Sequence, residues 1–475
     1  MKKSKSIITL LVLLFCSRIL LAQETNIIGN APYLPNQVLA LYGYDDYLTL
    51  TPLKKQEITS DANGKFSFAF KNSSTSLVFL KYKNVKVSFY CEPGKTYRLR
   101  ILKLDSIANQ NLSADIEAEA IFQNYDSLEL NQLIAKYNKY LDNFYLDNSK
   151  LIVVKAIKVL YKKIEDFKKQ TQKDFAYANN AYFKSYIKSS FAALDEIVFT
   201  PKASIYKEYY SGVLQYHSYD YIQGISSHFT DYLEQLGLTK KGASIFDDIN
   251  IRHNYDALKK SVSKADSIVT NDTLRELLVI KGLGELYYKA STKKYGVELV
   301  LEQIIKQALS KQNKTIAQNT LSRLTYLQIN SKAPDFDTID ATGTAIKLSS
   351  LTGKMVYLNF WSVNSISSME ELLAIKKLNE KYNGIISFVS VCSDEDSDAA
   401  KSFVKKNKLA WNMVYDKDKK VANIYTIKVV PAFFLIDKDG FLIKSPAESP
   451  SQNIEDTFRD MSQKKEKKGK VGEKD

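Results

Sequence analysis

The sequence is poor in the residues that break or cross-link a chain. Among 475 residues there are 17 glycines, 9 prolines, 3 cysteines and 3 histidines. So little glycine and proline excludes collagen-like, proline-rich and glycine-rich linker proteins. Three cysteines without a C-x-x-C pair exclude a zinc ribbon and a disulfide-stapled scaffold. No histidine follows His253, so the C-terminal part lacks an imidazole base, and we expect neither a metal nor a cofactor.

Length and composition indicate a folded protein of several domains. At about 150 residues per domain, the chain predicts about three domains. Hydrophobic residues make up 45% of the sequence, which is enough for folded cores. The formal net charge is +14, spread thinly along the chain with one basic run at the C-terminus. Because no RNA-binding signature accompanies these lysines, they indicate a solvated surface, and we expect no nucleic-acid partner.

A secretory signal peptide is predicted over residues 1–22. Lysines precede an apolar run at Ile7–Cys16, and Ala22 is a small residue suited to cleavage. The run is shorter than the roughly 20 residues that span a bilayer. We therefore expect export to the periplasm or cell envelope. Membrane anchoring by lipidation of Cys16 stays open, although the bulky Phe15 before it disfavours this alternative.

Residues 24–103 predict a small antiparallel β-sandwich. Short apolar runs of strand length are separated by turn signals, such as the Asp-Ala-Asn-Gly segment at 61–64. The predicted strands include 38–42, 66–70, 77–82 and 85–90.

Residues 105–330 predict a helical bundle. Pro201 is the single proline of this segment, and leucine, lysine and tyrosine recur at a spacing of three to four. We expect about eight or nine helices. The many tyrosines fit the edge of a core better than a platform that stacks ligands.

The C-terminal part predicts a mixed α/β sheet that is covered on both faces. Continuous apolar runs at 355–360, 385–391 and 432–436 alternate with amphipathic segments, and a final hairpin and helix follow. This domain is predicted over 333–462. A disordered basic tail is predicted over 463–475.

Several motifs of this part together resemble the TlpA/ResA branch of thioredoxin-like proteins. They are Ala333–Phe336, Gly353-Lys354, Phe360-Trp361, Val430-Pro431 and the segment Phe434–Gly440. The segment 24–103 is similar to the β-domain that precedes a thioredoxin-like domain in exported Bacteroidetes proteins. The resemblance implies a multi-domain α+β protein with a β-sandwich, a helical bundle and a thioredoxin-like domain.

The chain departs from this family at the redox motif. Where the family has C-x-x-C, this sequence has Ser365 and Ser368. A hydroxyl cannot form a disulfide, and a serine nucleophile needs a base that this histidine-free part lacks. We predict instead that Ser367 with Glu370, and Ser368 with Glu371, form capping boxes at the start of the helix.

These departures predict a redox-inactive binding or structural module of the cell envelope. The resemblance implies that Trp361, Val430 and Pro431 line a groove for an extended peptide or an envelope protein, because active relatives pair the backbone beside this proline with substrate peptide. One alternative is a thiol-disulfide oxidoreductase or thiol peroxidase-like enzyme that uses Cys392, alone or with Cys91. Another places function in the helical segment, where tyrosines would bind an envelope glycan or a partner.

Overall fold

The computed structural model describes residues 22–469, apart from 83–84, 103–115, 124–125, 341–342, 395–396 and 418. Cys16, nearly all of the predicted signal peptide and the end of the predicted tail lie outside the described residues. The chain divides into two compact units, one reaching Leu324 and one beginning at Thr325. No described helix is both long and apolar enough to cross a bilayer.

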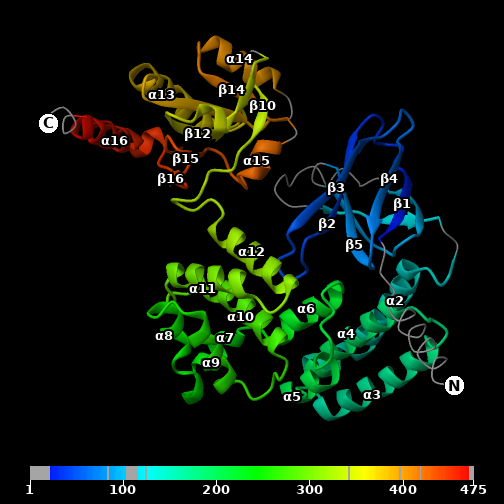
Figure 1. Ribbon diagram of the computed structural model, residues 1–475. Helices are drawn as coiled ribbons and strands as arrows, with labels where there is room; N and C mark the ends of the chain where they lie inside the picture. Colours follow the sequence, from blue (N-terminus) through cyan, green and yellow to red (C-terminus); the bar gives the residue numbers. More distant parts are fainter. Residues whose placement is uncertain are drawn as a thin grey trace, which may run out of the picture. The chain divides into compact units, whose positions relative to one another are not determined.

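The N-terminal unit begins with a sandwich of two β-sheets (Figure 1). One sheet has the order β4–β1–β7–β9 and the other β3–β2–β5–β6–β8. In β4, side chains alternate strictly between exposed and buried, which puts Phe66, Phe68 and Phe70 into the shared core. The strands are β1 (Gln23–Asn30), β2 (Val38–Tyr44), β3 (Pro52–Thr59), β4 (Lys65–Asn72), β5 (Ser76–Tyr82), β6 (Val85–Cys91), β7 (Thr96–Ile101), β8 (Ile116–Glu117) and β9 (Ala120–Phe122).

The prediction of a purely antiparallel sandwich is wrong in two places. β1 pairs with β7 in parallel, and β6 pairs with β8 in parallel. Strand periodicity is the same in both kinds of ladder, so the sequence pattern could not distinguish them. The strands also continue to Phe122, beyond the predicted limit at residue 103.

Eleven α-helices follow in the described residues, more than the eight or nine expected. Three of them have only four to six residues, too few to show a helical period. The helices are α2 (Leu130–Val153), α3 (Ile157–Asp174), α4 (Ala181–Ile197), α5 (Lys202–Ile205), α6 (Tyr219–His228), α7 (Tyr232–Gly237), α8 (Ile245–Asn250), α9 (Tyr255–Ala265), α10 (Asp272–Leu286), α11 (Lys294–Gln307) and α12 (Lys311–Thr325). A π-helical turn, η2 (Tyr206–Tyr210), continues α5.

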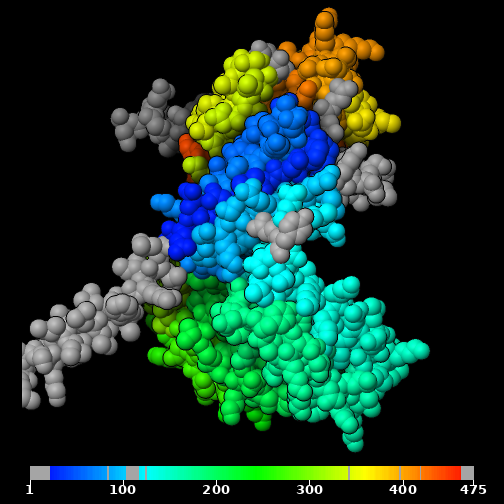
Figure 2. Space-filling model, turned by 90° about the vertical axis from the view of Figure 1, so that its right-hand side faces the viewer, coloured from blue at the N-terminus to red at the C-terminus, as the bar shows by residue number. Residues whose placement is uncertain are grey.

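Sandwich and helices pack against each other within this unit. Figure 2 shows the blue and cyan surface of the strands continuing into the green surface of the helices. Tyr47 belongs to the core of the helical part, and Gln223 of α6 donates a hydrogen bond to its carbonyl oxygen at 2.5 Å. Tyr90 of β6 and Tyr182 of α4 donate hydrogen bonds to the Asp220 carboxylate, at 3.0 and 3.2 Å. These contacts tie the β and α parts together through a buried polar cluster.

Asp220 makes the stability of this unit depend on pH. Burial raises the pKa of its carboxyl group to about 6, although the hydrogen bonds from Tyr90 and Tyr182 lower it. The folded protein therefore holds this proton more tightly than the unfolded chain does, and the resulting stabilisation is lost as pH rises from about 4 to about 6. Replacing Asp220 by Asn removes this loss. Between pH 4 and pH 7 the free energy of unfolding of the variant should therefore rise by up to about 3 kcal/mol relative to that of the parent.

Urea unfolding of both proteins across this pH range measures the gain. The matched control is Asp256→Asn, which removes an exposed carboxylate from α9. Parallel stability curves for the parent and Asp220→Asn would contradict the predicted linkage.

The C-terminal unit is a five-stranded mixed sheet with the order β14–β13–β12–β15–β16, and the predicted α/β fold is confirmed here. Helices α13, α14 and α16 cover one face, and α15 covers the other (Figure 1). The elements are β10 (Asp337–Ile339), β11 (Ala345–Lys347), η4 (Leu348–Leu351), β12 (Met355–Trp361), α13 (Ile366–Tyr382), β13 (Ile386–Cys392), α14 (Asp398–Lys406), β14 (Asn412–Tyr415), α15 (Lys420–Ile424), β15 (Ala432–Ile436), β16 (Leu442–Lys444), η5 (Pro450–Gln452) and α16 (Ile454–Gly469).

The last helix is longer than expected. We predicted its end near Met461 and a disordered tail from residue 463, but α16 reaches Gly469. Lysine, glutamate and glutamine are good helix formers, and no proline or glycine interrupts them before Gly469.

Candidate functional site

The candidate site lies where two parallel strands end. Trp361 at the end of β12 lies opposite Cys392 at the end of β13. The loop Ser362–Ser365 follows β12 and leads into α13, and Asp394 follows β13. The carboxyl ends of parallel strands are where α/β folds place their sites. Ser365, Ser368 and Cys392, which the sequence singled out, therefore lie in one region of the domain.

A single carboxylate organises the loop after β12. Asp394 accepts hydrogen bonds from the Ser362 hydroxyl, from the Val363 N–H at 2.8 Å and from the Asn364 side-chain amide at 3.3 Å. It also accepts from the Cys392 thiol, with 3.3 Å between Sγ and Oδ2. Asp394 was not among the site residues predicted from the sequence. Its only signal was an acidic residue two positions beyond a buried strand.

Ser365 is the N-cap residue of α13. Its backbone is extended, and its hydroxyl oxygen accepts a hydrogen bond from the Ser368 N–H at 3.2 Å. The Ser365 and Ser367 hydroxyl oxygens are 3.1 Å apart. The predicted capping boxes, Ser367 with Glu370 and Ser368 with Glu371, are therefore wrong. The helix begins earlier than they require, and Ser365 alone caps it.

Glu371 has a different role from the predicted cap. Its carboxylate accepts hydrogen bonds from the Ser449 hydroxyl at 2.8 Å, from the Ser451 N–H at 3.1 Å and from the Ser451 hydroxyl. The side chain thus joins α13 to η5, a turn far along the chain.

Neither Ser365 nor Ser368 is placed as a nucleophile. Ser368 is fully buried, and its hydroxyl has no hydrogen-bond partner among the described residues. Among the described residues, the Ser365 hydroxyl forms hydrogen bonds only with the Ser368 N–H and the Ser367 hydroxyl. Since no histidine follows His253 in the sequence, neither hydroxyl has an imidazole base in this unit.

Trp361 is a core residue, which corrects its predicted place in a peptide groove. The side chain is 0% exposed and packs beside Phe403, with 6.0 Å between ring centroids. Its indole N–H has no partner among the described residues. The side chain belongs to the core between the sheet and the helices α13, α14 and α16, so it cannot touch a bound peptide.

Val430 and Pro431 are half-buried and lie at the edge of the serine loop. The Val430–Pro431 peptide bond is cis. Phe360 pairs with Ala432, so Pro431 comes next to the end of β12. Ile366, 73% exposed, and Val429, 77% exposed, are large apolar residues on this side of the domain. We call Ser365, Ile366, Val429, Val430 and Pro431 the serine-loop surface.

The two cysteines in the described residues are buried, free thiols. Burial raises the pKa of Cys392 to about 12, and the nearby Asp394 carboxylate also disfavours a thiolate. Burial raises the pKa of Cys91 well above its usual value. Thiolate is the nucleophilic form of cysteine, so both thiols are poorly suited to exchange with a disulfide.

We therefore expect both thiols of residues 23–475, Cys91 and Cys392, to be inert at pH 8 while the protein is folded. Labelling with 5,5′-dithiobis(2-nitrobenzoate) should be at least about 100-fold slower than for a solution thiol, because almost no thiolate is present and neither sulfur is exposed. Full labelling is expected only in guanidinium chloride. Fast labelling of the native parent that disappears in Cys392→Ser would contradict this prediction.

Within the part of the chain that the structure describes, no three His, Cys, Asp or Glu side chains gather closely enough to hold a metal ion. The described groups of the serine-loop surface offer hydrogen bonding and apolar contact.

Comparison with known proteins places the C-terminal part in a family. The AhpC/TSA family matches residues 329–445. A thiol-disulfide oxidoreductase ResA of Bacillus cereus is 33% identical over 131 residues, which cover 27% of this chain and 76% of that protein. The chain belongs to the ResA-type thioredoxin-like family. ResA of Bacillus subtilis (strain 168) is 33% identical over 116 residues, 24% of this chain and 64% of that protein.

Solved structures similar to the ResA-type chain include two from Bacteroides. A thiol-disulfide oxidoreductase of Bacteroides fragilis NCTC 9343 has 24% identity and a TM-score of 0.24, over 25% of this chain and 91% of that one. The thioredoxin domain of a thiol-disulfide oxidoreductase of Bacteroides vulgatus has 23% identity and a TM-score of 0.26, over 28% and 97%. The sandwich and the helices up to Leu324 lie outside the matched AhpC/TSA segment.

Proposed function

We propose that this protein is an exported, redox-inactive member of the ResA-type family, with the domain arrangement of Bacteroidetes relatives. Its thioredoxin-like domain acts as a binding or structural module of the periplasm or cell envelope. The observation that carries the proposal is the placement of the Ser365 and Ser368 hydroxyl groups at the start of α13. One hydroxyl caps α13 and the other is buried, where the family has its two redox thiols.

The serine-loop surface supports recognition of an extended peptide. Ile366 and Val429 offer exposed apolar contacts. In the described part of the chain, the backbone N–H groups of Val429 and Val430 donate to no backbone carbonyl. An extended peptide can pair with such free backbone groups as an added strand, while its side chains take the apolar contacts.

A second candidate is a thiol-disulfide oxidoreductase or thiol peroxidase-like enzyme that uses Cys392. The names of the ResA relatives favour it. Against it stand the burial of Cys392 and the raised pKa of its thiol.

Insulin reduction by dithiothreitol distinguishes the two candidates. We expect residues 23–475 to give the same rate as dithiothreitol alone. Acceleration that is lost in Cys392→Ser would overturn the proposal in favour of the second candidate.

Peptide binding tests the surface itself. An array of extended peptides of about eight residues is expected to yield binders. Val429→Pro removes the backbone donor and should weaken them by about tenfold, whereas Val429→Ile keeps both the donor and the apolar contact and should change affinity little. Equal effects of both variants, with unchanged circular dichroism, would show that no strand is added here.

Export is tested separately. N-terminal sequencing of the protein from the periplasmic fraction should begin at Gln23. Recovery of the intact N-terminus from the cytoplasm would contradict the signal peptide.

A further inference from the structure

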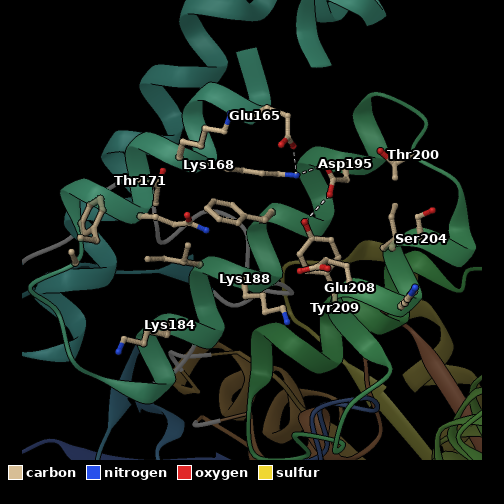
Figure 3. Close-up of a pocket in the computed structure, with 18 residues that line it drawn as sticks. Glu165, Lys168, Thr171, Lys184, Lys188, Asp195, Thr200, Ser204, Glu208 and Tyr209 are labelled. Carbon is tan, nitrogen blue, oxygen red and sulfur yellow. Dashed lines mark hydrogen bonds and ion pairs between the residues drawn. The ribbon is translucent and has the colours of Figure 1, made fainter. Parts of the chain in front are cut away.

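An open groove of about 920 Å³ lies among α3, α4 and the α5–η2 segment (Figure 3). Its apolar lining comes from Phe175, Ile187, Phe191 and Ile205. The two phenylalanines are each 7% exposed, and Ile205 is 1% exposed. The volume lies within the range of small-molecule pockets, about 300–1,000 Å³.

One wall of the groove is held by a buried polar network. The Lys168 ammonium donates to Asp195 at 2.5 Å and to Glu165 at 3.1 Å, and the Tyr209 hydroxyl donates to Asp195 at 2.7 Å (Figure 3). Asp195 is 7% exposed. Burial raises the pKa of the Tyr209 hydroxyl, and the Asp195 carboxylate beside it raises this pKa further. The network connects α3, α4 and η2. Lys168 thus contacts both carboxylates of this wall.

The remaining charge around the groove is positive. Lys169, Lys184, Lys188 and Lys207 are exposed and line the groove, against one further carboxylate, Glu208. Within the described residues, none of these four lysines forms an ion pair with a carboxylate. Lys184 instead donates to the Asn179 side chain at 2.9 Å, and the Lys188 ammonium lies 5.8 Å from the Tyr209 ring centroid.

We propose that this groove binds a small amphipathic anion. Such a molecule has an apolar or aromatic body and one carboxylate, sulfonate or phosphate group. The body lies on the Phe175, Ile187 and Phe191 side chains. The anionic group is held by Lys184 and Lys188, which lie one turn apart on α4 and therefore on one face of the helix. A cationic ligand would be repelled by these lysines, and a neutral ligand would form no ion pair with them.

Two fluorescent probes with the same aromatic body test the proposal. Residues 23–475 are titrated with 1-anilinonaphthalene-8-sulfonate and with uncharged N-phenyl-1-naphthylamine. We expect one sulfonate probe per chain, bound about tenfold more tightly than the neutral probe. The double variant Lys184→Gln/Lys188→Gln should weaken the sulfonate probe by about tenfold and leave the neutral probe unchanged, because two exposed charge contacts are lost.

Two further variants complete the test. Ser204→Trp fills the groove from an exposed lining position and should weaken both probes. Lys260→Gln/Lys306→Gln removes the same charge from α9 and α11, outside the groove lining, and should weaken neither probe. The proposal is overturned if no sulfonate probe binds, if the neutral probe binds as tightly, or if both lysine double variants weaken the sulfonate probe equally.

Discussion

Replacing both Ser365 and Ser368 by cysteine is expected to give this protein disulfide reductase activity. Position 365 is the N-cap of a 17-residue helix, and its side-chain oxygen already accepts a hydrogen bond from the N–H of residue 368. A thiolate there would gain the same donor and the positive end of the helix dipole. Insulin reduction by dithiothreitol should accelerate by about tenfold or more over the parent, since a larger fraction of the thiol is ionised than in solution.

The single variants separate the roles of the two positions. Ser365→Cys should attack oxidised glutathione, release one reduced glutathione and keep the other in a stable mixed disulfide, because residue 368 carries no thiol in this variant and Cys392 is buried. Ser368→Cys should be unreactive, because residue 368 is 0% exposed. A double variant that forms its internal disulfide but reduces insulin no faster than the parent would contradict this prediction, because two thiols at these positions would then not suffice for reductase activity.

Replacing Trp361 by Ala is expected to lower the free energy of unfolding of the C-terminal unit by about 3–5 kcal/mol. The side chain is fully buried among the residues that α13, α14 and α16 pack against the sheet. Trp361→Phe should cost clearly less, about 1–2 kcal/mol, since it keeps an aromatic ring and removes an indole N–H that has no partner among the described residues. Guanidinium unfolding followed by the fluorescence of Trp411, the second tryptophan of the chain, measures both.

A stable Trp361→Ala variant that loses only peptide binding would contradict this placement. Such a result would show that Trp361 lines a peptide groove, as predicted from the sequence. Equal destabilisation by Ala and Phe would show instead that the indole N–H is hydrogen-bonded, for example to a buried water.

Continuous apolar runs were the most reliable guide to the C-terminal fold. β12, β13 and β15 were predicted within one or two residues at either end. A strand in the middle of a covered sheet is buried on both faces, so nearly every residue is apolar and the run is conspicuous. β14 and α15 were missed because they have only four and five residues. Such short elements form because neighbouring elements pack on them, not because of a local pattern.

The candidate site was only partly visible in the sequence. Ser365 and Ser368 were found because the motif around them has a fixed spacing. Asp394 was not found, because it bonds to a loop about thirty residues earlier in the chain. The partners of Glu371 are 78 and 80 residues away. Hydrogen bonds across such separations leave no periodic signal.

The sequence by itself determined the class of each segment and the absence of a C-x-x-C pair. These follow from side-chain chemistry and from local periodicity, which each residue carries with it. Only the tertiary structure decided that Trp361 is buried, that Cys392 is shielded and that lysines of α3, α4 and η2 surround one groove. Burial and charge clustering depend on which segments pack together, and packing joins residues that are distant in the chain.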